Sequence, residues 1–283
     1  MRVDTGWKVR LAPNLGLNSL ETPMFLASVG GTDPVAHVAF IADQGFAGVE
    51  DNFLKLRSAK DQERIGRALL QRGLAMGCFV ANPGSWDRPL WVSRESDARA
   101  KLRADLDTSI ESAQRTGGRV MTVLTGFDAK LPRSFQIAAL IENLRRLAPA
   151  AERAGVVLGL EACNSWEYPM LFLNDVREAY SVAAAVDSPA VGVIFDVYHV
   201  QMMTGDVIRN LQRCRDRIVA VQIADNPGRT EPGTGEINWS NLFRALNQMA
   251  YEGLVELEHE IAEPGMEGER AALERLRAIN ALV

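Results

Sequence analysis

Short apolar runs alternate with longer amphipathic segments along the whole chain. Nearly continuous apolar runs are typical of parallel strands, which helices cover on both faces. The pattern predicts eight strands, at Lys8–Pro13, Ala47–Glu50, Ala75–Ala81, Arg119–Leu124, Val156–Ala162, Val191–Val197, Ile218–Ala224 and Leu254–His259.

Segments with helical periodicity lie between these runs. The first begins with Asp33 and Pro34, an N-cap residue followed by a proline in the first turn. The predicted helices are Asp33–Asp43, Gln62–Gln71, Ser96–Thr116, Gln136–Arg153, Asn174–Val186, Trp239–Met249 and Glu269–Leu282. No low-complexity linker interrupts this recurring βα unit, so we predict one domain over residues 1–283.

Repeated βα units form either a closed barrel or an open doubly wound sheet. An open sheet that binds a nucleotide would carry a GxGxxG motif after its first strand, but this chain has NLGLNSLETP there. Its 283 residues are slightly more than a typical (β/α)8 barrel has. We therefore predict the α/β class and a (β/α)8 TIM barrel.

Composition excludes several classes of protein. The formal net charge of −5 argues against a nucleic-acid partner. No apolar segment approaches the roughly 18 residues that span a bilayer, so we expect no membrane partner. The three cysteines are widely spaced and form no CxxC pair, which argues against a disulfide framework or a zinc knuckle. We expect a cytoplasmic protein.

Polar residues stand at the ends of the last four predicted strands. In a barrel, the carboxyl ends of the strands build the active site. Side-chain alternation places three glutamates of the last strand on one face and does not choose among them. The strand-end residues are Glu161; Asp196 and His199; Gln222 and Asp225; and Glu256, Glu258 and Glu260.

A divalent cation explains these carboxylates best. A buried carboxylate is costly without a partner, and the same strands carry no matching set of Lys or Arg. Any single one could instead cap the helix that follows its strand. A set of carboxylates with a glutamine carbonyl is an all-oxygen site, which suits Mg²⁺ or Mn²⁺.

Three segments resemble the hydroxypyruvate isomerase family, which belongs to the xylose isomerase-like TIM barrels often labelled sugar phosphate isomerase/epimerase. They are QIADNPGRTEPGTGEINW, FDVYHVQMMTGD and YEGLVELEHE. The resemblance is strong over Val156–Glu260 and only general before it.

The resemblance implies a metal ion, Mg²⁺ or Mn²⁺ with Co²⁺ as an alternative. Its ligands would be Glu161, Asp196, Gln222 and Glu258. The family's last ligand follows a glycine by five residues, here Gly253, and this selects Glu258. The resemblance also implies that both glutamates act as acid and base, and that the protein is a homodimer or homotetramer.

Five residues are candidates for contacts with substrate. The resemblance places His199 and Arg229 on substrate oxygens. Related ketose 3-epimerases carry a substrate-binding glutamate at the spacing of Glu167, but they usually have His where this chain has Gln222. Glu50, at the end of a strand, and Asn82, in a loop with Trp86 and Trp91, complete the set.

The expected function is a metal-dependent isomerase that interconverts a small ketose, hydroxy-ketone or 2-oxo acid through a cis-enediolate. Glu161 or Glu258 would remove the proton next to the carbonyl. A ketose 3-epimerase and a metal-dependent dehydratase or lyase remain alternatives. A barrel nuclease of the endonuclease IV type would need several histidines, but the chain has only three. His37 is predicted to be structural, and His259 is predicted to point away from Glu258 and to be either structural or a support for a ligand.

Overall fold

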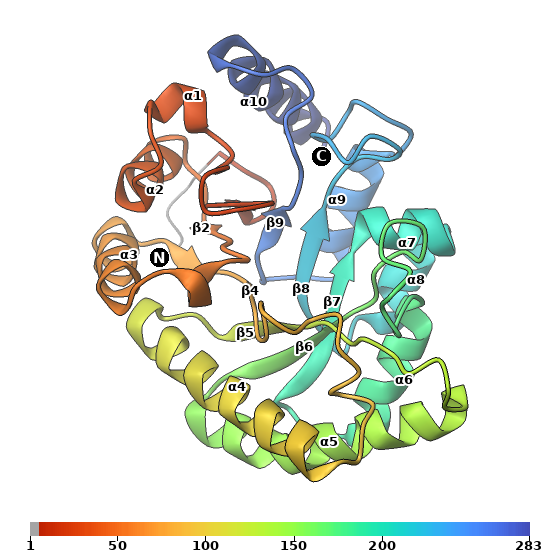
Figure 1. Ribbon diagram of the computed structural model, residues 1–283. Helices are drawn as coiled ribbons and strands as arrows, with labels where there is room; N and C mark the ends of the chain where they lie inside the picture. The colour runs from red at the N-terminus through yellow and green to blue at the C-terminus, as the bar shows by residue number, and fades with distance from the viewer. Residues whose placement is uncertain (1–5) are drawn as a thin grey trace.

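The computed structural model describes residues 6–283, with parallel strands inside and helices outside (Figure 1). Seven strands form one sheet in the order β1-β9-β8-β7-β6-β5-β4, and β2 pairs with β3. The strands are Leu11–Pro13 (β1), Gly48–Val49 (β2), Ala75–Met76 (β3), Phe79–Val80 (β4), Val120–Val123 (β5), Val157–Glu161 (β6), Val191–Asp196 (β7), Ile218–Ile223 (β8) and Val255–Leu257 (β9).

Backbone hydrogen bonds join the two sheets into a ring. The N–H of Glu50 donates to the carbonyl of Pro13 at 2.9 Å, which places β2 beside β1. The N–H of Val80 donates to the carbonyl of Asn52 at 3.3 Å, which ties β4 to the segment after β2. The predicted TIM-barrel fold is therefore confirmed.

The third predicted strand, Ala75–Ala81, is divided into β3 and β4. Between them, the N–H of Cys78 donates to the Glu256 carboxylate at 2.8 Å instead of to a neighbouring strand. A Cβ on Gly77 would lie 2.3 Å from the same carboxylate oxygen, so glycine is needed for this close approach.

The helices are α1 to α10, with one 3₁₀ turn. Their bounds are Leu26–Val29 (α1), Pro34–Asp43 (α2), Leu54–Leu56 (η1), Ala59–Arg72 (α3), Ser96–Thr116 (α4), Arg133–Ala154 (α5), Val176–Val186 (α6), Val197–Met203 (α7), Val207–Cys214 (α8), Trp239–Gln248 (α9) and Met266–Ala281 (α10). In residues 6–283, no helix is long and apolar enough to cross a membrane.

Helix α7 is absent from the sequence prediction although it carries part of the site. Its first residues continue the apolar run of β7, which conceals the change from strand to helix. Asp196 makes that change, because its side chain accepts hydrogen bonds from the N–H groups of Tyr198 and His199 at 2.7 and 3.3 Å. As a result, the ring of His199 lies beside the carboxylates at the ends of β6 and β7.

Candidate active site

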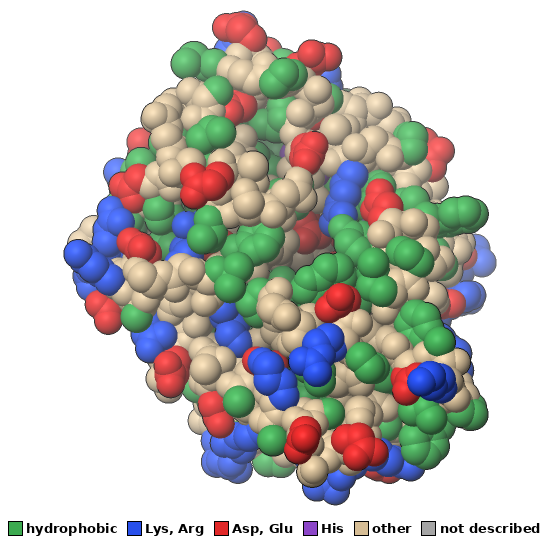
Figure 2. Space-filling view, in the orientation of Figure 1, with side chains coloured by type: hydrophobic (Ala, Val, Ile, Leu, Met, Phe, Trp, Pro, Cys, Tyr) green, Lys and Arg blue, Asp and Glu red, His purple; other side chains and the backbone are tan. Residues whose placement is uncertain are grey.

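A cavity of about 240 Å³ opens at the carboxyl ends of the strands. Figure 2 shows the corresponding hollow, with hydrophobic side chains around it and acidic atoms at its floor. Polar groups line one part and apolar groups the rest. The lining residues are Leu17, Asn18, Asn52, Phe53, Val80, Pro83, Trp86, Leu124, Glu161, Cys163, Tyr168, Leu171, His199, Arg229 and Glu258.

Three buried carboxylates converge here, and two of them, Glu161 and Glu258, line the cavity. Glu161 ends β6, Asp196 ends β7 and Glu258 follows β9, and each offers an oxygen atom within 4.8 Å of the other two. Burial raises the pKa of Glu161, and the negative charge of Glu258 raises it further. Burial also raises the pKa values of Asp196 and Glu258, while the charge of Arg229 opposes both shifts. A cation would stabilise the charged forms of all three.

Gln222 completes a set of oxygen donors. Its Nε2 donates to Glu50 Oε1 at 2.8 Å, whereas its buried Oε1 has no hydrogen-bond partner among the described residues. An unpartnered buried carbonyl beside carboxylates fits a hard divalent cation, since such ions take oxygen ligands. The four predicted ligands therefore fit a metal ion, and Glu50 orients one of them.

A second group, Glu161, Cys163 and His199, also brings possible ligand atoms within 4.8 Å of one another. Burial raises the pKa of the Cys163 thiol well above its ordinary value, and the thiol donates to Glu161 at 3.4 Å. A thiol suits softer cations than Mg²⁺ or Mn²⁺, which take oxygen ligands. The oxygen set is therefore the better candidate metal site.

His199 lies against the carboxylates without a close hydrogen bond from Nε2. This atom is 3.6 Å from Glu161 and 3.5 Å from Asp196. Burial lowers the pKa of His199 to about 3, so the ring is neutral near pH 7. Its Nδ1 lies 2.9 Å from Asn164 Nδ2.

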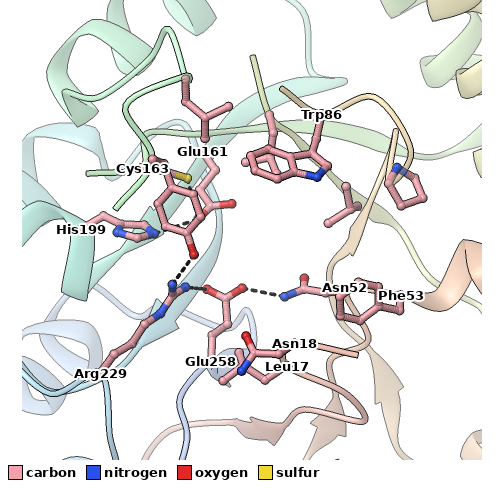
Figure 3. Close-up of a pocket in the computed structure, with 15 residues that line it drawn as sticks. Leu17, Asn18, Asn52, Phe53, Trp86, Glu161, Cys163, His199, Arg229 and Glu258 are labelled. Carbon is pink, nitrogen blue, oxygen red and sulfur yellow. Dashed lines mark hydrogen bonds and ion pairs between the residues drawn. The ribbon is translucent and has the colours of Figure 1, made fainter. Parts of the chain in front are cut away.

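Arg229 reaches the cavity from the loop after β8 (Figure 3). Its guanidinium donates to the Tyr168 hydroxyl at 2.6 Å and to Glu258 at 3.3 Å. Burial raises the pKa of Tyr168 to about 12, so this hydroxyl stays protonated. Arg229 thus lies beside a predicted base and carries a positive charge into the cavity.

The loop that carries Arg229 is built around the buried side chain of Asp225. Its carboxylate accepts hydrogen bonds from the N–H of Gly233 at 2.7 Å and from the indole of Trp239 at 2.8 Å. Its backbone carbonyl accepts from the N–H of Arg229 at 2.9 Å. Asp225 therefore shapes the loop, although its position at a strand end had made it a candidate site residue.

Glu167, Glu50 and Asn82 do not line the cavity. Glu167 accepts hydrogen bonds from the Tyr198 hydroxyl at 2.6 Å and from Asn164 at 2.9 Å. Asn82 is buried, and neither of its side-chain polar atoms has a partner in the described chain. Their predicted contacts with substrate stay predictions.

The structure separates the three glutamates at the end of the last strand. Glu258 reaches the cavity, whereas Glu256 lies deeper and bonds to Cys78. Burial raises the pKa of Glu256 to about 8. Glu260 is exposed and accepts a hydrogen bond from Asn18. The geometry thus places the predicted ligand, Glu258, with the other carboxylates.

Sequence reasoning missed Asn52, Tyr168 and Cys163. Asn52 donates to Glu258 at 2.7 Å, and it stands two residues after Glu50 at the end of a predicted strand. Cys163 follows Glu161 by two residues, the spacing that returns a strand to the same face. Tyr168 lies next to Glu167 in sequence, but nothing in its surroundings there points to Arg229.

Comparisons with known proteins identify the family. The family described as xylose isomerase-like TIM barrel matches residues 38–280. The hydroxypyruvate isomerase of Escherichia coli (strain K12) is 34% identical over 81% of this chain and 89% of its own length. A 2-oxo-tetronate isomerase of Cupriavidus necator is 32% identical over 78% of this chain and 85% of its own. The chain therefore belongs to the xylose isomerase-like TIM barrel family.

Solved structures agree with this fold. A crystal structure described as an AP endonuclease, family 2, from Brucella melitensis has a TM-score of 0.80 and 29% identity, over 92% of this chain and 96% of its own. The 3-keto-D-glucoside 4-epimerase of E. coli has a TM-score of 0.75 over 95% and 99% of the two chains, and its 22% identity shows the fold alone. The names of the curated relatives place this chain among isomerases.

Proposed function

We propose that the protein is a divalent-metal-dependent isomerase that interconverts a short 3-hydroxy-2-oxo acid and its 2-hydroxy-3-oxo isomer. One observation carries the proposal: three buried carboxylates converge, and two of them line a small cavity together with the charged Arg229. The unpartnered carbonyl of Gln222 belongs to the residue that pairs with Asp196 across β7 and β8. The names of the curated relatives, hydroxypyruvate isomerase and 2-oxo-tetronate isomerase, support this substrate class.

Glu161, Asp196, Gln222 and Glu258 would hold the metal, and Mg²⁺ or Mn²⁺ suits these oxygen donors. When bound, a divalent cation supplies Lewis-acid polarisation of the substrate carbonyl, which makes the neighbouring C–H more acidic. Arg229 and the Tyr168 hydroxyl lie where they can bind substrate oxygens. The apolar part of the cavity wall excludes water from the reacting carbons.

Proton transfer belongs to Glu161 and Glu258. One of these carboxylates removes the proton from C3, and the electron pair moves into an enediolate. The proton then returns to C2, while the hydroxyl proton passes from the C3 oxygen to the C2 oxygen. Burial is the largest cause of the raised pKa values of both glutamates in the metal-free protein, and a bound cation would favour the charged form that accepts a proton.

A ketose 3-epimerase is the second candidate. The spacing of Glu167 favours it, because a glutamate at this position binds substrate in the family's ketose 3-epimerases. In the structure Glu167 accepts hydrogen bonds from Tyr198 and Asn164, and its carboxylate lies 3.8 Å from Arg229 without lining the cavity. An endonuclease IV type nuclease is disfavoured, because of the three histidines only His199 lines the cavity.

Proton NMR in D₂O tests the proposal. The enzyme with Mg²⁺ is incubated with hydroxypyruvate, a 2-oxotetronate, fructose, tagatose or ribulose, and the C–H signals are followed. Metal-dependent loss of the C3–H signal with appearance of the isomer supports the proposal. Exchange on a free ketose with inversion at C3 would establish the epimerase. No exchange on any substrate, with metal bound, would refute both.

A further inference from the structure

We infer that Asn164 locks His199 in a single neutral tautomer, in which Nε2 carries the proton and donates it as a hydrogen bond toward the cavity. Asn164 is fully buried in the loop after β6, and His199 lies in the first turn of α7. The position of the ring proton follows from contacts alone. Its use in catalysis rests on the proposed function.

The Asn164 amide has its orientation fixed by two backbone groups. Its Oδ1 accepts from the N–H of Trp166 at 3.1 Å and from the N–H of Glu167 at 2.9 Å. Its Nδ2 donates to the Glu167 carboxylate at 2.9 Å and faces His199 Nδ1 at 2.9 Å. Both donors and both acceptor positions of the amide are therefore used. A flipped amide would direct its NH₂ group against two backbone donors.

This fixed donor determines the state of the ring. Because an N–H faces Nδ1, that nitrogen must present a lone pair, so the proton of the neutral imidazole is on Nε2. Nε2 has no hydrogen-bond partner within residues 6–283 and lies beside Glu161 and Asp196. The bound substrate would supply the missing acceptor oxygen.

The proton on Nε2 limits what His199 can do in the site. A protonated Nε2 cannot ligate a metal ion, which leaves the cation to the oxygen donors and separates His199 from the Glu161–Cys163 pair. The same nitrogen cannot serve as the general base. His199 is therefore a donor to the charge that develops on substrate oxygen, and Asn164 is its positioning residue.

The first test is an NMR spectrum of the wild-type protein with ¹⁵N-labelled histidine, which needs no substrate. The chain has three histidines, and the other two serve as references. His259 Nδ1 faces the carbonyl of Glu260, and His37 Nε2 faces that of Gly31, both at 2.8 Å. A carbonyl only accepts, so these rings show the two opposite tautomers. We expect His199 to match His37, and a His199 that matches His259 overturns the inference.

The variant Asn164→Asp tests the lock itself. A carboxylate can only accept, so we expect a proton on His199 Nδ1 in this variant, while Mn²⁺ binding, followed by electron paramagnetic resonance, stays within a few-fold. The expected loss in kcat is roughly 10- to 100-fold, as for other residues that orient site groups. Asn238→Asp makes the same change at the N-cap of α9 and should alter neither the His199 spectrum nor kcat.

Each result separates the lock from the proposed function. An unchanged His199 spectrum in Asn164→Asp overturns the lock. An altered spectrum with unchanged kcat overturns the catalytic use of Nε2. The expected tautomer in a protein that exchanges no substrate proton upholds the lock and removes the proposed function. Should the variant fail to fold, the wild-type spectrum still decides the tautomer.

Discussion

Two tiers of buried carboxylates occupy the barrel, and they differ in what surrounds them. The upper tier is Glu161, Asp196 and Glu258, whose oxygen atoms converge and of which Glu161 and Glu258 line the cavity. The lower tier is Glu50 and Glu256, and neither of these lines the cavity. Burial is the largest cause of a raised pKa in both tiers. A perturbed pKa therefore does not distinguish the reactive carboxylates from the others here. They are distinguished by the convergence of their oxygen atoms and by access to the cavity.

The tiers also differ in their partners. In the lower tier, Glu50 accepts from Gln222 and Glu256 accepts from the N–H of Cys78. The upper tier has the charge of Arg229 beside Glu258, which lowers the pKa of that carboxyl against the effect of burial. Each lower-tier carboxylate is thus held by a hydrogen-bond donor of the barrel itself. The upper tier is built to ionise when a cation binds.

The largest expected difference between the tiers is in activity. Glu258→Gln should lower kcat by about 10²- to 10⁴-fold, the range that a general base contributes. Glu260→Gln is the matched control, because it removes a carboxylate two residues away that is exposed. Proton exchange in D₂O measures both. Wild-type exchange in Glu258→Gln would exclude Glu258 as the base and leave Glu161 as the remaining candidate.

The stability that a bound metal adds should depend on the upper tier and not on the lower tier. Metal at about 100 times its Kd should stabilise the wild type by about 2.7 kcal/mol, measured as a rise in Tm. Asp196→Asn should lose this rise, because it removes a ligand, and Glu256→Gln should keep it. A rise that depends on Glu256 and not on Asp196 would place the metal in the lower tier.

The pH dependence of the free energy of unfolding should reveal the protonation of Glu256 in the lower tier. The pKa of Glu256 is about 8 in the fold, against about 4.3 in an unfolded chain. Folding therefore takes up a proton between these values. The stability that neutral Glu256 contributes is fully present below about pH 4.3 and is lost as pH rises through about 8.

Comparison of metal-free wild type with Glu256→Gln isolates this effect. The difference in the free energy of unfolding should fall with rising pH by at most about 1.4 kcal/mol per pH unit, the value for one proton. Urea unfolding at several pH values between about 5 and 8 measures it. A constant difference would show that Glu256 is already ionised in the fold.

The smallest expected effect concerns the tuning of Glu258. The hydrogen bond from Asn52 lowers the pKa of this carboxyl. Asn52→Ala should therefore raise that pKa and shift the acidic limb of the kcat/KM profile to higher pH, by less than about one unit. An acidic limb that stays in place would mean that Glu258 does not control it.

Periodicity, strand-end chemistry and the family segments predicted the charged residues of the candidate site. They placed Glu161, Asp196 and Gln222 on successive strands, and the structure brings them to one end of the barrel with His199 and Arg229 nearby. Local sequence suffices here because parallel strands in a barrel direct their carboxyl ends to the same face.

The sequence did not predict helix α7 or the division of the third strand. Both depend on a single side chain acting on backbone groups, as Asp196 caps α7 and Glu256 bonds to Cys78. Neither hydrogen bond changes the period of the apolar residues, so the pattern of apolar residues cannot predict helix α7 or the divided strand.

The sequence by itself determined the barrel, the order of its strands and the residue types at their ends, because these follow from local periodicity and from the short connections of βα units. Only the tertiary structure decided which carboxylates converge, that the side-chain oxygen of Gln222 has no partner in the described chain, and which atom of Asn164 faces His199 Nδ1. Those properties depend on the distances and directions between atoms from strands and loops far apart in the chain.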